Sequence, residues 1–274
     1  EVVAVVPVWP NLTAQPAILG ARVRRVALRA HAGAWRLDLD ELLAAVTPRT
    51  RVLLVNAPNN PTGWTLTGAE QRAIVEHCRR TGTWIVADEV YDRIWFGAGA
   101  AAPSFLDVAD AEDRLVVANS FSKSFLMTGW RLGWLVTPAS LTEAVGKLIE
   151  FNSSCAPVFV QRGGLAALGI AEAFVPALVR QLRERRDLLV DALARLGGIE
   201  VAAPPGGMYA FFRVDGEDDS LAIAKRLVAD HGLGLAPGAA FGAEGEGWLR
   251  WCFASRDAQR LRQGVQRLAQ ALRL

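Results

Sequence analysis

The chain has 274 residues, of which 51% are hydrophobic and 21% charged, a composition typical of a globular protein with substantial buried cores. Its formal net charge of +2 is too small to favour nucleic acid as a partner, and no apolar run reaches the ~20 residues that span a bilayer. Three widely spaced cysteines, without a CxxC or Cys/His cluster, argue against a disulfide framework or zinc site. We therefore expect no metal, no nucleic-acid or membrane partner, and a cytoplasmic location.

The first half of the chain alternates short β-branched runs with longer amphipathic stretches. The sequence predicts strands at Val2–Val6, Arg24–Leu28, Val52–Asn56, Trp84–Asp88, Leu115–Asn119 and Leu132–Thr137. A helix is predicted at Thr67–Thr81, where Thr67 and Glu70 form a capping box and Gly82 ends the helix. Strands that alternate with helices predict an α/β fold with a mostly parallel central sheet flanked by helices.

The pattern changes from Ser140 onward, where longer helices appear. The sequence predicts helices at Ser140–Phe151, Val158–Leu168, Glu172–Leu196, Ser220–His231 and Arg256–Leu272, with strands at Ile199–Ala202, Met208–Val214 and Trp248–Phe253. We expect a large domain over residues 1–165 and a smaller α+β C-terminal domain over residues 166–274.

Polar segments follow three of the predicted strands at the point where each strand ends. They are NAPNNPTG (56–63), ADEVY (87–91) and NSFSK (119–123). Alone, NPTG is an ordinary turn and Asp88 an ordinary helix cap. Because ligands gather at the carboxyl ends of strands in open α/β sheets, the recurrence predicts that these loops form one site.

Lys123 is an unusual residue in this chain, which contains 27 arginines and three lysines. A guanidinium keeps its charge at neutral pH, whereas an amine can lose its proton and attack a carbonyl carbon. The rare lysine at position 123 therefore raises the question of what an amine does there.

Together with GWRLGW (129–134) and LRWCFA (249–254), these segments resemble the class I/II aminotransferases, which are pyridoxal-phosphate (PLP) enzymes of fold type I in the aspartate aminotransferase superfamily. The resemblance follows the family's order over essentially the whole chain. It implies a PLP-binding large domain, a homodimer, and transfer of the amino group of an L-amino acid to a 2-oxo acid through a Schiff base on Lys123.

The resemblance also implies the residues at the reacting centre. Lys123 matches the lysine that binds PLP and later acts as a general base. Asp88 matches the carboxylate that faces the pyridine nitrogen and keeps it protonated. Asn60 and Tyr91 match the pair that hydrogen-bonds the phenolic oxygen of the cofactor, and Asn60 also borders the substrate.

Further positions match the residues that hold PLP and substrate. Ser120, Ser122 and Arg131 match the phosphate ligands, and Trp9 matches the aromatic ring that stacks on the cofactor. Arg250 matches the arginine that clamps the substrate α-carboxylate. Tyr209, in PPGGMYAFF (204–212), is expected to serve packing.

Other interpretations stay open at this level. Similar sites catalyse β-elimination, decarboxylation or γ-substitution, and some transcription regulators carry an aminotransferase-like domain that senses an effector. Residues 132–161 contain no arginine that could grip a distal carboxylate, which favours neutral or aromatic substrates. The family's upstream phosphate-binding turn does not precede Trp9, so we expect the natural protein to be longer.

Overall fold

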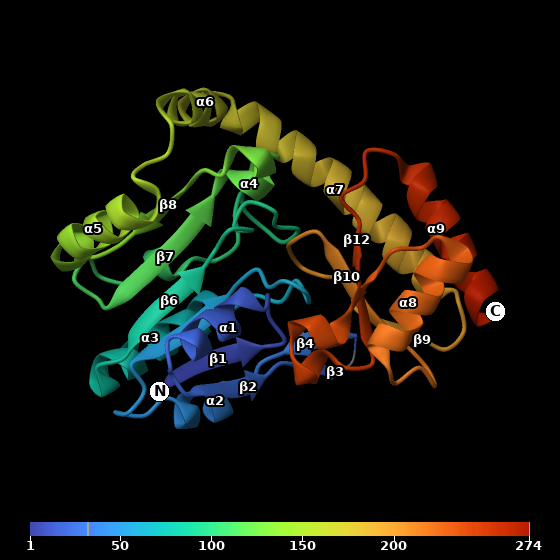
Figure 1. Cartoon of the computed structure of the whole chain (residues 1–274), viewed down its shortest axis with the longest axis horizontal. Helices are drawn as coiled ribbons and strands as arrows, with labels where there is room; N and C mark the ends of the chain where they lie inside the picture. Colours follow the sequence, from blue (N-terminus) through green and yellow to red (C-terminus); the bar gives the residue numbers. More distant parts are fainter. Residues whose placement is uncertain (32, 274) are drawn as a thin grey trace.

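The computed structural model describes residues 1–31 and 33–273 and contains two main sheets (Figure 1). The larger sheet has the strand order β2-β1-β5-β6-β7-β8. Its strands are β1 (Val2–Val6), β2 (Val23–Ala27), β5 (Val52–Asn56), β6 (Trp84–Asp88), β7 (Leu115–Ser120) and β8 (Gly133–Val136). All neighbouring strands run parallel except β8, which pairs antiparallel with β7. The predicted α/β class and all six predicted strands are confirmed, with ends shifted by at most one residue.

The smaller sheet has the order β11-β12-β10-β9 and is antiparallel. Its strands are β9 (Ile199–Val201), β10 (Tyr209–Val214), β11 (Ala236–Pro237) and β12 (Trp248–Cys252). A further two-stranded sheet, which was not predicted from the sequence, pairs β3 (Arg29–His31) with β4 (Ala34–Arg36). The strands of this small sheet come from the C-terminal part of the chain, and their residues lie near the loops of the large sheet.

Helices connect and cover the strands (Figure 1). They are α1 (Asn11–Ile18), α2 (Leu39–Ala45), α3 (Gly68–Thr81), α4 (Phe121–Ser124), α5 (Thr142–Ser153), α6 (Val158–Gly169), α7 (Ala171–Ala194), α8 (Ser220–His231) and α9 (Ala258–Leu272). The predicted capping box of α3 is present, since Thr67 accepts from the Glu70 N–H, and Gly82 ends the helix in the left-handed conformation. The predicted domain boundary at 165/166 falls inside α6, and the division into 1–165 and 166–274 stays a prediction.

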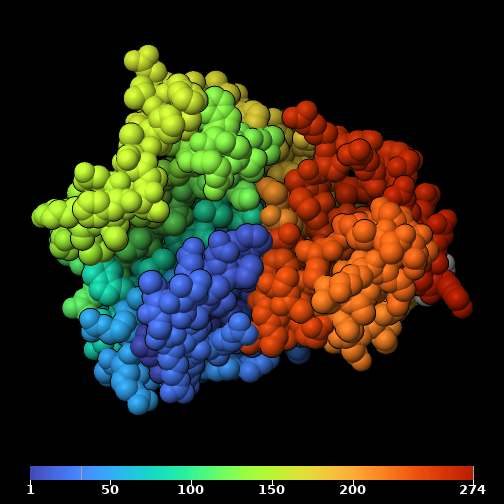
Figure 2. Space-filling view, viewed as in Figure 1, coloured from blue at the N-terminus to red at the C-terminus, as the bar shows by residue number. Residues whose placement is uncertain are grey.

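One aromatic cluster joins the two sheets. The rings of Phe211 on β10 and Trp248 on β12 stack with centroids 5.4 Å apart, and Trp35 on β4 lies 4.6 Å from Trp248. All three belong to the same buried core as the inner strands of the large sheet. Figure 2 shows the N-terminal segment (blue) against the C-terminal part (orange), where Val8 N–H donates to the Phe241 carbonyl at 3.1 Å. This packing holds the small sheet beside the strand ends of the large one.

Within residues 1–31 and 33–273, no single helix is long and apolar enough to cross a membrane. By length and composition alone, the bent pair α6 and α7 passes that test together.

Candidate active site

The side chains of all nine predicted site residues line one cavity of about 440 Å³. It lies at the carboxyl ends of β5, β6 and β7, and β10 and β12 of the small sheet close it. The nine residues are Trp9, Asn60, Asp88, Tyr91, Ser120, Ser122, Lys123, Arg131 and Arg250. Four further lining residues were not assigned to the site from the sequence: Asn11, Asn56, Val90 and Tyr209. The parallel strands and their order therefore bring segments far apart in sequence to one place.

Lys123 is positioned by the turn from β7 into α4. Ser120 caps this one-turn helix, because its Oγ accepts a hydrogen bond of 3.0 Å from the Ser122 N–H. The Lys123 Nζ lies 5.6 Å from the centroid of the Tyr91 ring. Burial lowers the pKa of the Lys123 amine, and the nearby Arg131 cation adds to the effect. The neutral, nucleophilic form of this amine is therefore more accessible than in an ordinary lysine.

Asp88 ends β6 and is fixed through its backbone, since Asn56 Nδ2 donates to the Asp88 carbonyl at 2.9 Å. Its Oδ1 accepts a long hydrogen bond of 3.3 Å from the Val90 N–H. Burial raises the pKa of the carboxyl to about 6, although this N–H and Lys123 oppose the shift. In the described part of the chain, Asp88 forms no ion pair within 4.0 Å. A cationic group in the cavity would therefore stabilise its ionised form.

Arg250 enters the cavity from β12 and reaches Asn60. Its Nη1 donates to Asn60 Oδ1 at 2.9 Å, and the Asn60 N–H donates to Asn56 Oδ1 at 2.7 Å. The guanidinium carbon lies 4.2 Å from the centroid of the Tyr209 ring and 4.7 Å from that of Phe241. Its Nε is buried without a partner among the described residues. Because the guanidinium faces the interior and its hydrogen-bond donors are only partly paired, it is suited to bind an anionic ligand.

Two serine residues and a further charged residue, Arg131, also line the cavity. Ser122 is buried, and Ser120 and Arg131 line the same cavity. Arg131 adopts the left-handed conformation with φ 52°, which is uncommon for a residue with a side chain, and its Nη1 donates to the Thr128 carbonyl at 2.8 Å. Non-glycine residues in this region concentrate at functional sites. This donor set fits the oxygens of a phosphate group.

Trp9 follows β1 and lines the cavity with 41% of its surface exposed. It is therefore not a buried core aromatic, in contrast to Trp35 and Trp248. An exposed ring beside a cavity can stack on a flat ligand.

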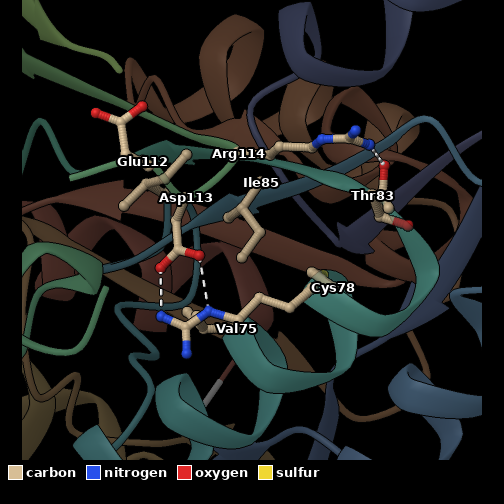
Figure 3. A pocket seen from close by; sticks show the side chains of 10 residues that line it. Val75, Cys78, Thr83, Ile85, Glu112, Asp113 and Arg114 are labelled. Carbon is tan, nitrogen blue, oxygen red and sulfur yellow. Dashed lines mark hydrogen bonds and ion pairs between the residues drawn. The ribbon is translucent and has the colours of Figure 1, made fainter. Parts of the chain in front are cut away.

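A second cavity of about 250 Å³, drawn in Figure 3, lies where α3 ends and β6 and β7 begin. Arg79 pairs there with Asp113 at 2.6 Å, and burial raises the pKa of the nearby Cys78 thiol to about 12. It is at the opposite end of the strands from Lys123. Two of its charged side chains, Arg79 and Asp113, pair with each other, and Arg114 donates to the Gly82 carbonyl. We assign no chemistry to this cavity.

The chain is similar to known proteins over nearly its whole length. The model of the family described as aminotransferase class I and II matches residues 1–268. The chain is 35% identical over 270 residues to the arginine–pyruvate transaminase of Pseudomonas aeruginosa, covering 98% of this chain and 68% of that protein. It is 34% identical over 261 residues to an aspartate aminotransferase of Musicola paradisiaca, covering 93% and 64%.

A solved structure of similar shape is the aspartate aminotransferase of Thermotoga maritima, with a TM-score of 0.89 and 31% identity over 100% of this chain and 70% of that one. The chain thus spans about two thirds of the length of these relatives. The match over nearly the whole chain, together with the fold, shows that the protein belongs to the aminotransferase class I and II family, whose members are PLP-dependent transaminases of fold type I.

Proposed function

We propose that the protein is a PLP-dependent aminotransferase that moves the amino group of an L-amino acid to a 2-oxo acid. The observation that carries this proposal is the convergence of Lys123, Asp88 and Arg250 on one cavity. These three supply the amine, the carboxylate and the guanidinium that amino-acid chemistry on this cofactor needs. When bound, PLP supplies an electron sink for the electron pair left on the substrate Cα after its proton departs.

The described residues fit the cofactor in charge and donor chemistry. Asp88 is a half-buried carboxylate without an ion-pair partner among the described residues, which suits a protonated pyridine nitrogen. Asn60 uses its side-chain oxygen for Arg250, so its amide nitrogen is the group that can donate to the phenolic oxygen. Ser120, Ser122 and Arg131 together offer hydroxyl and guanidinium donors to the phosphate, and the exposed Trp9 ring offers a stacking surface.

Lys123 and Arg250 have different roles toward the substrate. Arg250 binds the α-carboxylate with its fork of N–H donors, which orients the Cα–H bond. The Lys123 amine would hold the cofactor, and the released amine would take the proton from the substrate Cα as a general base and later return it. Its lowered pKa favours the neutral form that accepts this proton.

The described cavity wall also bears on the class of amino donor. Its guanidinium groups are Arg131, which we assign to phosphate, and Arg250, which we assign to the α-carboxylate. A distal carboxylate of the substrate meets no further arginine in the described wall. We therefore propose donors with uncharged side chains, tested by comparing phenylalanine, leucine and aspartate in single-turnover assays.

We further propose that the protein is a homodimer. The segments β8, α5 and α6, of which α5 and α6 project as the yellow-green region in Figure 2, expose large apolar side chains. They include Trp134, Leu135, Leu148, Phe151 and Phe159. Contiguous exposed apolar surface marks association sites in soluble proteins. Sedimentation equilibrium giving a monomer at micromolar concentration would contradict this assembly.

A cytoplasmic location is proposed from the cysteines. Cys78, Cys155 and Cys252 are all free thiols, which is typical of a reducing compartment. Cell fractionation with an antibody to the protein tests the location.

Absorbance spectroscopy tests the proposed reaction. The protein mixed with PLP should develop a visible band that Lys123→Ala abolishes. An amino acid should bleach this band and a 2-oxo acid should restore it, whereas a lyase or decarboxylase would release its product without requiring an oxo acid. A band that survives Lys123→Ala would refute the proposal.

A further inference from the structure

The sequence contains two tyrosines, and the structure brings them together. The hydroxyl oxygens of Tyr91 and Tyr209 lie 3.0 Å apart, although 118 residues separate them. Tyr91 follows β6 of the large sheet, and Tyr209 begins β10 of the small sheet. Both side chains are buried, and both line the cavity that holds Lys123. This hydrogen bond therefore links the two sheets inside the active site.

Tyr209 also contacts the proposed carboxylate clamp. In the antiparallel pairing of β10 with β12, Arg250 is opposite Phe211, and Tyr209 is two residues before Phe211 on the same face. The Arg250 guanidinium consequently lies over the Tyr209 ring, with its central carbon 4.2 Å from the ring centroid. One side chain thus touches both Tyr91 and Arg250.

The hydrogen-bond capacity of a phenol fixes the direction of the Tyr91–Tyr209 bond when a ligand is present. Burial raises the pKa of both hydroxyls, so both are protonated at neutral pH. Each hydroxyl then has one proton to donate. If Tyr91 gives its proton to a ligand oxygen in the cavity, the 3.0 Å contact is satisfied only when Tyr209 donates to Tyr91. The Arg250 cation opposes the burial effect on the Tyr209 pKa, which makes Tyr209 a better donor.

We propose that Tyr209 is a positioning residue for this reaction: its hydroxyl keeps Tyr91 as a donor toward the phenolic oxygen of the cofactor, and its ring holds the Arg250 guanidinium over the substrate site. This inference rests on the proposed function. It goes beyond a packing role, since packing alone requires neither the hydroxyl nor a ring beneath the guanidinium.

Two substitutions at position 209 separate these roles. Tyr209→Phe removes the hydroxyl and keeps the ring, whereas Tyr209→Leu removes both. Tyr91→Phe is the reference, and circular dichroism of each variant checks that it is folded. Two properties of the PLP-loaded protein are measured without turnover: the pH midpoint of its visible absorbance change, and the affinity for propionate, an unreactive carboxylate detected by its spectral effect.

The hydroxyl is tested by the pH midpoint. Donors to the cofactor oxygen stabilise its anionic form, so weakening Tyr91 as a donor raises the midpoint. Tyr91→Phe should raise it most, and Tyr209→Phe should raise it by roughly 0.2–0.5 pH unit, since cooperative support is a fraction of one hydrogen bond. In a Tyr91→Phe background, Tyr209→Phe should add nothing, because its effect runs through Tyr91.

The ring is tested by propionate. Tyr209→Phe should leave the dissociation constant unchanged within about twofold, and Tyr209→Leu should weaken binding about fivefold, the size of one lost cation–π contact.

Several results would overturn the inference. These are an unchanged midpoint in Tyr209→Phe, an equal shift in the Tyr91→Phe background, an unshifted midpoint in Tyr91→Phe itself, or wild-type propionate affinity in Tyr209→Leu. Failure of the proposed function looks different, because then the wild-type protein develops no Lys123-dependent band.

Discussion

The Arg250 guanidinium donates a hydrogen bond of 2.9 Å to the side-chain oxygen of Asn60, a residue 190 positions away in the sequence. Arg250 comes from β12 of the small sheet, and Asn60 comes from the loop after β5 of the large one. The bond holds the guanidinium in the cavity and orients the side-chain amide of Asn60. The backbone N–H of Asn60 in turn donates to Asn56 Oδ1 at 2.7 Å. The proposed carboxylate clamp and the proposed cofactor contact are thus parts of one network.

Arg250→Lys should lower kcat/KM about 100-fold, with most of the change in KM. Lysine keeps the charge but loses the fork that binds a carboxylate through two N–H groups. Asn60→Ala should lower kcat/KM less, and the double variant should be less impaired than the product of the two single effects, because the two residues share a network. Steady-state kinetics measures all three. Wild-type kcat/KM in Arg250→Lys would contradict the assignment of the clamp.

Lys123→Arg should keep the fold and abolish transamination. The side chain is of similar length and positive charge, but a guanidinium does not deprotonate at neutral pH, so it can neither attack an aldehyde nor take a proton from Cα. Thermal unfolding should give a Tm near that of the wild type. Single-turnover assays with an amino donor should show no conversion, and normal turnover would mean that Lys123 is not the reactive amine. Lys147→Arg, at an exposed ion pair with Glu143 on α5, is the matched control and should be fully active.

Asp88→Asn should stabilise the cofactor-free protein at pH 8. Burial raises the pKa of Asp88 from 3.8 to about 6, so its contribution to stability is fully present below pH 3.8 and is lost as pH rises through about 6. Asparagine stays neutral throughout this range. After allowance for partial exposure, the gain at pH 8 should be about 1–2 kcal/mol.

Urea denaturation of both cofactor-free proteins at pH 4 and pH 8 measures this effect. The difference between the two proteins should shrink toward zero at pH 4, where Asp88 is largely protonated. The buried Glu89, whose pKa rises to about 7, affects both proteins alike and cancels from the comparison. With PLP bound, the order should reverse, because the pyridine nitrogen then faces a carboxylate in the wild type alone.

Gly63→Ala should destabilise the protein by about 2 kcal/mol or more. Gly63 ends the NAPNNPTG segment with φ +73°, and an added Cβ would lie 2.4 Å from Pro204 Cβ and 2.6 Å from the Gly206 carbonyl oxygen. The loop that carries Asn60 would have to move away from the residues that precede β10. Urea denaturation measures the change. Gly68→Ala is the matched control, since its nearest atom is 4.0 Å away and it begins α3; it should be neutral or slightly stabilising.

The sequence alone determined much of the large sheet and its site loops. Strands β5 and β6 were predicted with their observed ends, because continuous apolar runs bounded by turn residues mark buried parallel strands. The segments after β5, β6 and β7 had to meet because parallel strands end at one edge of a sheet. Helix α1 escaped prediction because it contains Pro16 and buries no residue. Helix α2 was also not predicted, although Asp38, which accepts from the Glu41 N–H, is a sequence signal for its start.

The tertiary structure alone decided which side chains touch within the site. Tyr209 was expected to pack; it is buried as expected, but it also contacts Tyr91 and Arg250. Asn56 stood in a motif taken from the sequence, yet its bonds to Asp88 and Asn60 depend on the pairing of β5 with β6. Apolar periodicity and turn chemistry act over a few residues and can be read from the chain. The contacts of Arg250 and Tyr209 depend on the register of β10 with β12 and on how the small sheet packs against the large one, and both are set by burial over the whole molecule.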